Sequence, residues 1–169
     1  MEIERKFLID KFPEHLPLKE ESTMYQGYIS VMPTVRIRKK VSEKATSYKM
    51  TIKSSGEMIR HEVEFDIPEA KYNELEEVFC PKPIIKFKRN YILPDGKILE
   101  CNLVDPGTET EFMYAEIEFN SVEEAECYPL PDFLNKEVTF DNSYKMNNYW
   151  KRTRWKFKEF NLCIITHQM

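Results

Sequence analysis

Charged residues at every second position are the feature of this chain with the clearest chemical potential. Glu2, Glu4 and Lys6 open the sequence, and like-charged pairs recur along it. These pairs are Glu2/Glu4, Arg36/Arg38, Lys49/Lys53, Glu62/Glu64, Lys86/Lys88 and Glu116/Glu118. Alternate residues of a β-strand lie on one face, and neighbouring like charges destabilise a sheet. We therefore expect groups of opposite sign to bind at these faces.

Carboxylates and basic side chains of this kind could act together on a phosphate chain bound to metal. Glutamate oxygens suit hard divalent cations such as Mg²⁺ or Mn²⁺, while arginine and lysine bind phosphate oxygens. The four glycines, at positions 27, 56, 96 and 107, cannot form a Walker-type or dinucleotide-type phosphate loop. Any phosphate chemistry must therefore depend on side chains.

The charged faces could also lie in water, as they do in many half-exposed antiparallel sheets. Two features favour an inward orientation. A solvated surface usually mixes both signs, whereas the motif-bearing strands mostly carry one sign at successive positions on a face. The few helices could cover the apolar faces from outside, so that a closed barrel would surround the charges and remove free strand edges. Such a lumen would need water, metal and a polyanion, because unpaired buried charge is costly.

The composition fits one globular domain. The chain has 169 residues, of which 41% are hydrophobic and 32% charged. The formal net charge of -4 averages a basic block between Thr34 and Arg60 and an acidic block between Glu109 and Glu126. The overall acidity, and the lack of aromatic residues interleaved with the bases, argue against nucleic-acid binding. No apolar run approaches the roughly 18 residues of a membrane span, so we expect a soluble cytoplasmic protein without a membrane partner.

The cysteines and histidines are too scattered to suggest a metal or catalytic centre. The four cysteines form no CxxC pair, which favours reduced, partly buried thiols; they are Cys80, Cys101, Cys127 and Cys163. None of the three histidines lies within a helical turn of another. We expect packing or surface roles for them.

Strands must position most of the charged pairs. Period-two alternation predicts strands over 1–9, 24–31, 35–41, 47–53, 59–67, 84–93, 97–104 and 111–119, with a last core strand over 136–140. After Pro68 the apolar spacing becomes helical, which predicts one amphipathic helix over 68–79. Ser121-Val-Glu-Glu has the form of a capping box that opens a short helix, and a further helix is expected over 141–151. The predicted fold class is mainly β, of the α+β type.

Residues 1 to about 150 resemble the CYTH superfamily, also called the triphosphate tunnel metalloenzymes. Glu2-Ile3-Glu4-Arg5-Lys6 matches the ExExK signature of that family. It is followed in order by Gln26-Gly27-Tyr28, Arg36-Ile37-Arg38, Lys49-Met50-Thr51-Ile52-Lys53, Arg60-His61-Glu62-Val63-Glu64, Lys86-Phe87-Lys88-Arg89, Glu100, Ala115-Glu116-Ile117-Glu118-Phe119 and Glu137-Val138-Thr139-Phe140-Asp141. The resemblance implies a closed eight-stranded antiparallel β-barrel with a few flanking helices, a tunnel domain over residues 1–157. Residues 158–169 would form a carboxy-terminal tail without an assigned role.

The resemblance also implies a role for each group of charged residues. The metal ligands would be Glu2, Glu4, Glu116 and Glu118, which would bind Mg²⁺ or Mn²⁺. The phosphate-binding residues would be Lys6, Arg36, Arg38, Lys49, Lys53, Arg60, Lys86, Lys88 and Arg89. The catalytic residues would be Glu62 and Glu64, which would orient the attacking water or the waters of a second metal, together with Lys6.

Two departures from the family pattern bear on these roles. Relatives often show Lys-x-Arg where this chain has Lys86-Phe87-Lys88, so either Lys88 or Arg89 would supply the second cation. Relatives often show Glu-x-Asp where this chain has Glu100-Cys101-Asn102. One expected carboxylate is therefore neutral, which affects the second metal site.

The implied reaction is metal-dependent hydrolysis of inorganic triphosphate, with nucleoside triphosphates as secondary substrates. Phosphoryl transfer depends mainly on positioning and electrostatics, so water can serve as the nucleophile without a Ser-His or Cys-His pair. Three alternatives stay open: a class IV-type adenylate cyclase, a thiamine triphosphatase and a noncatalytic polyphosphate-binding module. The expected partner is a small-molecule triphosphate or polyphosphate, and a homodimer stays open.

Overall fold

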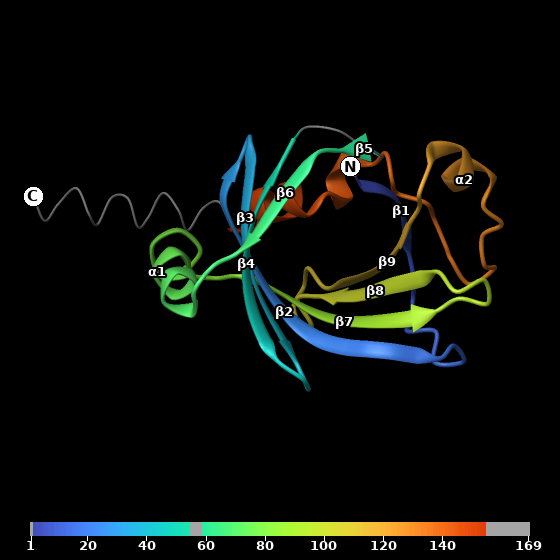
Figure 1. The fold of residues 1–169 in the computed structure, drawn as a ribbon, viewed down its shortest axis with the longest axis horizontal. Helices are drawn as coiled ribbons and strands as arrows, with labels where there is room; N and C mark the ends of the chain where they lie inside the picture. The colour runs from blue at the N-terminus through green and yellow to red at the C-terminus, as the bar shows by residue number, and fades with distance from the viewer. Residues whose placement is uncertain (1, 55–58, 155–169) are drawn as a thin grey trace, which may run out of the picture.

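One curved antiparallel sheet dominates the fold (Figure 1). The computed structural model describes residues 2–54 and 59–154, and the side chains of residues 2, 59 and 60 fall outside this description. Its nine strands are β1 Glu2–Leu8, β2 Leu18–Val31, β3 Thr34–Ser42, β4 Thr46–Lys53, β5 Ile59–Arg60, β6 Glu62–Asp66, β7 Ile84–Ile92, β8 Ile98–Val104 and β9 Phe112–Glu118. The helices are α1 Glu69–Phe79, α2 Val122–Cys127 and a 3₁₀ turn over Asn142–Tyr144. Residues 146–154 are also helical.

The alternation in the sequence predicted most of these strands correctly. Eight predicted segments coincide with strands to within a few residues, apart from the start of β2, which begins at Leu18 instead of Met24. The predicted amphipathic helix is α1, and the predicted capping box opens α2, where the Ser121 hydroxyl accepts a hydrogen bond from the Glu124 amide. The mainly β, antiparallel fold class is therefore confirmed.

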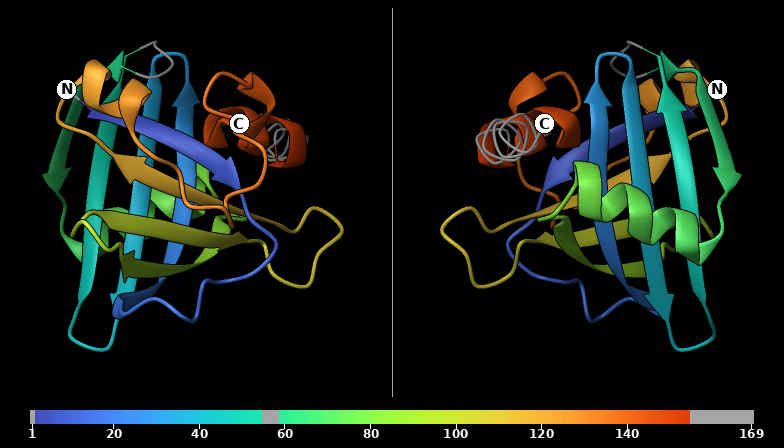
Figure 2. Two further views of the ribbon diagram at one scale, coloured as in Figure 1. Left: turned by 90° about the vertical axis from the view of Figure 1, so that its right-hand side faces the viewer. Right: turned by 90° about the vertical axis from the view of Figure 1, so that its left-hand side faces the viewer.

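The two ends of the sheet order are neighbours in the chain. The order is β5-β1-β9-β8-β7-β2-β3-β4-β6, and a single residue, His61, separates β5 from β6. The sheet curls so far that β6, paired with β4, returns beside β5, paired with β1 (Figure 2). The sequence predicted a closed barrel of eight strands. In residues 2–54 and 59–154, the predicted strand over 59–67 is divided at His61, and no backbone ladder joins β6 directly to β1.

The remaining edge of β1 is covered by an irregular segment. Leu8 donates its amide to the Lys136 carbonyl, and Val138 donates to the Lys6 carbonyl. The Arg5 guanidinium also binds the Glu137 carboxylate through two hydrogen bonds of 2.9 and 2.6 Å. The predicted core strand over 136–140 is wrong, because this segment forms only an isolated bridge between Phe7 and Glu137.

Helix α1 crosses the outer face of β2, β3 and β4 (Figure 2). Its close approach to β2 depends on Gly27. A Cβ atom at Gly27 would lie 2.4 Å from the Cβ of Cys80, the residue that ends α1. Gly27 is therefore required by packing, because the backbone of β2 and the end of the helix leave no room for a methyl group.

The last described helix, over 146–154, is anchored by a buried carboxylate. Asp105 accepts hydrogen bonds from the Tyr149 hydroxyl at 2.5 Å and from the Ile85 amide at 3.0 Å. It also forms an ion pair of 2.6 Å with Arg154. The predicted helix over 141–151 is thus replaced by a 3₁₀ turn followed by a longer helix fixed to the end of β8.

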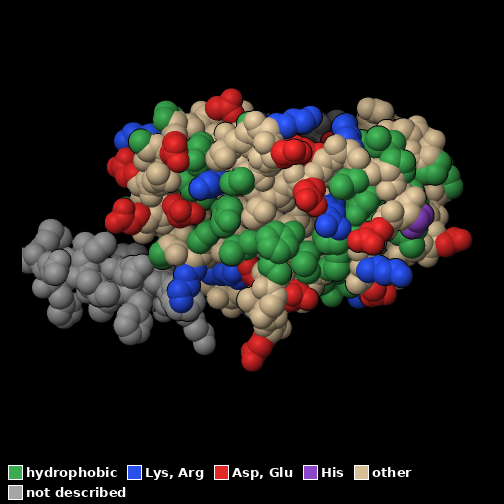
Figure 3. All heavy atoms as spheres, turned by 90° about the horizontal axis from the view of Figure 1, so that it is seen from below, with side chains coloured by type: hydrophobic (Ala, Val, Ile, Leu, Met, Phe, Trp, Pro, Cys, Tyr) green, Lys and Arg blue, Asp and Glu red, His purple; other side chains and the backbone are tan. Residues whose placement is uncertain are grey.

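The apolar faces of the strands point outward, away from the charged side chains. One cluster, which includes Phe7, Leu99 and Ile117, packs under α2 and the loops beside it. A second cluster packs under α1 through Ile37 and Tyr72, and it extends to the helix over 146–154, where Trp150 packs against Tyr28 of the inner face. Where no helix covers the sheet, hydrophobic side chains reach the surface; Figure 3 shows them between charges of both signs. The charged faces are therefore the inner ones.

Candidate functional site

The inward faces of the strands surround one cavity of about 800 Å³. Its wall contains most of the residues that the sequence singled out: Glu4, Lys6, Arg36, Arg38, Lys53, Glu62, Glu64, Lys86, Lys88, Glu116 and Glu118. They come from six strands, β1, β3, β4, β6, β7 and β9. Acidic and basic rows that are distant in sequence therefore meet around a shared space.

The acidic wall lies where β1 pairs with β9. The register places Glu4 opposite Glu118 and Lys6 opposite Glu116. Lys6 forms an ion pair of 2.9 Å with Glu116. Burial disfavours ionisation of Glu116, but Lys6 and Lys86 outweigh this effect and lower its pKa. For Glu118, burial and the neighbouring carboxylate of Glu100 raise the pKa.

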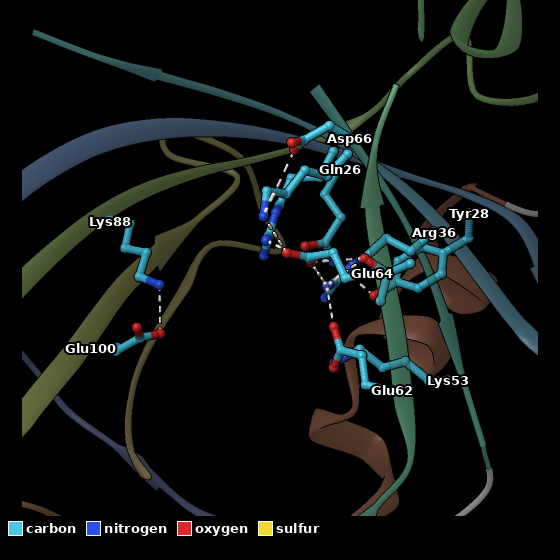
Figure 4. Close-up of polar contacts among 12 residues, drawn as sticks. Gln26, Tyr28, Arg36, Lys53, Glu62, Glu64, Asp66, Lys88 and Glu100 are labelled. Carbon is cyan, nitrogen blue, oxygen red and sulfur yellow. Dashed lines mark hydrogen bonds and ion pairs between the residues drawn. The ribbon is translucent and has the colours of Figure 1, made fainter. Parts of the chain in front are cut away.

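The opposite wall combines bases from β3 and β4 with carboxylates from β6. The Arg36 guanidinium lies 3.3 Å from Glu62 and 3.6 Å from Glu64 (Figure 4). Arg38 lies 3.0 Å from Glu64. Lys53 pairs with Glu62. Burial and the adjacent Arg36 lower the pKa of Arg38, which shows how closely the positive charges are gathered. Burial opposes ionisation of Glu64, but the surrounding bases lower its pKa.

Strands β7 and β8 supply the third wall. Lys88 forms an ion pair of 2.5 Å with Glu100, which Figure 4 shows apart from the arginine wall. Lys86 is buried and donates a 3.1 Å hydrogen bond to the Tyr114 hydroxyl. Burial lowers the pKa of Lys86 well below its ordinary value, although Glu116 opposes this effect.

Four predicted site residues are not among those that the structure places along the cavity wall. The prediction that Arg89 binds phosphate is wrong, because its side chain points outward and binds Glu21 at 2.9 Å. Lys88 is therefore the inward cation of this motif. Lys49 does not line the cavity, although it pairs with Glu64 at 2.7 Å. The side chains of Glu2 and Arg60 lie outside the described residues.

The cavity wall also contains residues that the charge pattern could not identify. Uncharged side chains of β2, β8 and β9 line it, namely Met24, Gln26, Tyr28, Asn102 and Tyr114. Alternation along β2 could have placed the first three inward, because they share one face of the strand. The segment from Asn142 to Asn148 lies at the cavity as well. No local signal in the sequence predicts that placement, which depends on tertiary packing.

The donor atoms of the acidic wall fit a hard divalent cation in their chemistry. Glu4 and Glu118 face each other with Glu100 nearby, and carboxylate oxygens are the ligands that Mg²⁺ and Mn²⁺ prefer. Repulsion from Glu100 contributes to the raised pKa of Glu118, and a cation would relieve it. However, among the side chains that the structure describes, no three acidic, histidine or cysteine groups are spaced to hold a metal ion.

The basic wall fits an anion. Arg36 is buried, and its Nε atom has no hydrogen-bond partner within the described part of the chain. A buried donor without a partner is unusual and indicates a missing acceptor. Arg36 can surround a phosphate chain with charge-assisted donors, together with Lys6, Arg38, Lys53 and Lys88.

Comparison with known proteins gives relatives that cover almost the whole chain. The chain is 34% identical over 148 residues to the inorganic triphosphatase of Nitrosomonas europaea, a match that covers 85% of this chain and 93% of that protein. It is 32% identical over 162 residues to the inorganic triphosphatase of Acetivibrio thermocellus, covering 94% and 98%. A solved crystal structure of an inorganic triphosphatase superposes with a TM-score of 0.62 at 28% identity, covering 88% of this chain and 93% of that chain. No family model matches the chain. Within the described residues, no helix is long and apolar enough to cross a membrane.

Proposed function

Because this chain belongs to the CYTH superfamily of triphosphate tunnel enzymes, we propose that it hydrolyses inorganic triphosphate in the central cavity, with the help of a divalent cation. One observation carries the proposal. Bases from β1, β3, β4 and β7 converge with carboxylates in a single cavity, although their positions in the sequence are far apart. That arrangement suits a short, highly charged phosphate chain.

The bases bind and orient the substrate. Arg36, Arg38 and Lys53 hold one part of the phosphate chain, and Lys6 and Lys88 hold it from the other walls. Fixed positive groups in a partly enclosed site stabilise the charge that develops on the transferred and leaving groups. Arginine can bind two phosphoryl oxygens at once, which also fixes the direction of the chain.

Water is the proposed nucleophile, oriented by Glu64 and Glu62. Glu64 accepts a 3.0 Å hydrogen bond from the Thr51 hydroxyl, which holds one carboxylate oxygen in place. The bases around Glu64 outweigh its burial and lower its pKa, so that the carboxylate is ionised at neutral pH. An ionised carboxylate in this position can accept a hydrogen bond from the attacking water.

The cation would be held by Glu4 and Glu118, with Glu2 on the same strand as Glu4 and with Glu116 adjacent. When bound, Mg²⁺ or Mn²⁺ would neutralise charge on the phosphoryl oxygens. The carboxylate-only donor set supports this proposal. We also propose that the sheet functions as a closed barrel, because β5 and the segment over 135–139 together cover the edge of β1.

A panel of substrates tests the proposal. The purified chain is incubated with triphosphate, pyrophosphate, ATP, thiamine triphosphate and long-chain polyphosphate, with Mg²⁺, with Mn²⁺ and with excess EDTA. We expect metal-dependent release of phosphate, fastest from inorganic triphosphate, and none in EDTA. Formation of cyclic AMP and pyrophosphate from ATP would instead assign a cyclase. Tight polyphosphate binding without turnover would assign a binding module, and turnover in EDTA would remove the metal from the proposal.

A further inference from the structure

An uncharged amide inside the charged cavity has no role in the function proposed so far. Gln26 lines the cavity and its side chain is 0% exposed. Its Oε1 atom has no hydrogen-bond partner within the described part of the chain. Buried polar atoms are nearly always paired, so the orphaned atom of Gln26 indicates a ligand that this position serves.

The surroundings of Gln26 favour an anionic ligand. The β2–β3 register places Gln26 opposite Arg38, and Tyr28 opposite Arg36. Figure 4 shows Gln26 and Arg36 directed toward the same part of the cavity. The unpartnered Nε atom of Arg36 belongs to the same wall. An anion beside Gln26 would therefore meet a positive field from two arginines.

Tyr28 allows the amide of Gln26 to present a donor to such an anion. Gln26 Nε2 donates to the Tyr28 hydroxyl at 2.7 Å. A hydroxyl can donate as well as accept, and the two ends of an amide are assigned from their hydrogen bonds. Burial raises the pKa of Tyr28 to about 12, so the phenol keeps its proton. With the amide turned over, Tyr28 donates to Oε1 and the NH₂ group points to the ligand.

Asn102, another buried amide at the cavity with an orphaned oxygen, cannot be turned over in the way that Gln26 can. Asn102 is also buried, lines the cavity and has an orphaned amide oxygen. However, its Nδ2 atom donates to the Glu100 carbonyl, at 3.3 Å. Turning this amide over would place two acceptors against each other, so Asn102 keeps its oxygen toward the cavity. An oxygen in that position suits water or a cation, and not a phosphoryl group.

We propose that Gln26 is a substrate-binding residue whose amide, oriented by the Tyr28 hydroxyl, donates a hydrogen bond to a phosphoryl oxygen beside Arg36 and Arg38. The inference rests on the proposed function, because it needs a phosphate chain in the cavity. It adds a neutral donor to a set of charged ones. A neutral donor contributes directional binding without adding to the repulsion between neighbouring cations.

Calorimetric titration of the full chain with sodium triphosphate, in EDTA to prevent turnover, tests this proposal. We expect Gln26→Leu to weaken binding by about tenfold or more, since it removes a hydrogen bond to a charged acceptor. Tyr28→Phe keeps the ring but loses the hydroxyl that orients the amide, and should weaken binding by a smaller factor. Asn90→Leu is the matched control: Asn90 also has an orphaned amide oxygen on the sheet but does not line the cavity, so it should bind as the wild type does.

The outcomes separate this proposal from the one on which it rests. If wild-type protein neither binds triphosphate in EDTA nor hydrolyses it with Mg²⁺ or Mn²⁺, the proposed function fails and the role of Gln26 fails with it. If wild type hydrolyses triphosphate but binds it only with metal, the KM of Gln26→Leu for triphosphate in Mg²⁺ replaces the titration, with the same expectation of about tenfold. If wild type binds and folded Gln26→Leu binds within twofold of it, the role of Gln26 alone is overturned. An equal loss in Asn90→Leu would also overturn it, because the effect would then come from general packing. If Gln26→Leu does not fold, Gln26→Asn replaces it, because it withdraws the amide by one methylene. Its binding of triphosphate is then compared with wild type in the same way.

Discussion

At the scale of single residues, the direction of each side chain decides whether a charge belongs to the site. Glu4 and Glu118 face each other across neighbouring strands and into the cavity. Arg89 follows Lys88 directly and points out of it. Adjacent residues of a strand point to opposite faces, so that one step along the chain separates a cavity residue from a surface residue.

Glu4→Gln should abolish metal-dependent turnover. The substitution keeps the size of the side chain but removes the charge that a cation requires, and the loss of activity should be at least about 100-fold. Phosphate release from triphosphate in Mg²⁺ and Mn²⁺ measures it, and circular dichroism checks the fold. Glu126→Gln, at an exposed position on α2, is the control. Wild-type activity in Glu4→Gln would exclude Glu4 from the metal site.

Lys88→Met and Arg89→Met should have very different effects on kcat/KM for triphosphate. Lys88→Met removes a cation from the cavity and leaves Glu100 without its partner, so kcat/KM for triphosphate should fall by about 10-fold or more. Arg89→Met removes ion pairs with Glu14 and Glu21 and a cation–π contact with Phe12, all of them outside the cavity. Its kcat/KM should stay within about twofold of wild type. A larger loss for Arg89→Met would mean that it, and not Lys88, supplies the second cation.

At the scale of elements, the wall of the cavity depends on two helices, α1 on its outer side and the helix over 146–154 beside the cavity itself. Helix α1 lies close enough to β2 that Cys80 occupies the space beside Gly27. The helix over 146–154 is fixed to Asp105, at the end of β8, and its first residues line the cavity. Neither helix supplies a charged group that the charge pattern predicted for the site. Both hold in place the strands and residues that form it.

Gly27→Ala should destabilise the protein by about 1–3 kcal/mol, because the new methyl group overlaps the Cβ of Cys80. The same change in a Cys80→Gly background should cost less, since the overlapping atoms are then absent. Urea unfolding of the four proteins in this double-mutant cycle gives the coupling energy between the two positions. An equal cost of Gly27→Ala in both backgrounds would show that the contact with Cys80 is not the cause.

The sequence predicted the strands and the inward charges because both depend on a local pattern with a period of two. The same period could have decided between Lys88 and Arg89, since Lys86 and Lys88 share a face. The segment over 136–140 was mispredicted because its β-branched residues suggest a strand, whereas its single bridge to Phe7 is set by distant packing. Gln26 carries no charge, so the charge pattern could not single it out. The placement of the Asn142–Asn148 segment depends on tertiary packing, which no local pattern encodes.

At the scale of the whole molecule, residues far apart in the chain hold the sheet in its curled form. Arg5 on β1 and Glu137 in the segment beside it are 132 residues apart in sequence, and their two hydrogen bonds fasten that segment to the sheet. Strand β5 pairs with the same edge of β1 that this segment covers. The curled form of the sheet thus depends on contacts between segments that are distant from one another in the chain.

The Arg5–Glu137 pair should make part of the stability depend on pH. The hydrogen bond from Arg5 lowers the pKa of Glu137 in the folded protein, opposed by burial. A carboxylate with a depressed pKa stabilises the fold above its unfolded pKa of about 4.3, and this contribution is lost as the pH falls through the folded pKa. Urea unfolding should therefore show wild type more stable than Glu137→Gln at neutral pH, with the gap closing under acid conditions. A gap that is constant with pH would contradict this origin.

The cavity carries its own counterions. Lys6, Lys53 and Lys88 are already engaged by Glu116, Glu62 and Glu100 before any ligand arrives. Uptake of a polyanion is therefore an exchange reaction, in which phosphate oxygens displace carboxylates from the lysines. Each displaced carboxylate loses one counterion and therefore attracts a cation more strongly. Anion and cation uptake are for this reason thermodynamically linked, and each should increase the affinity for the other.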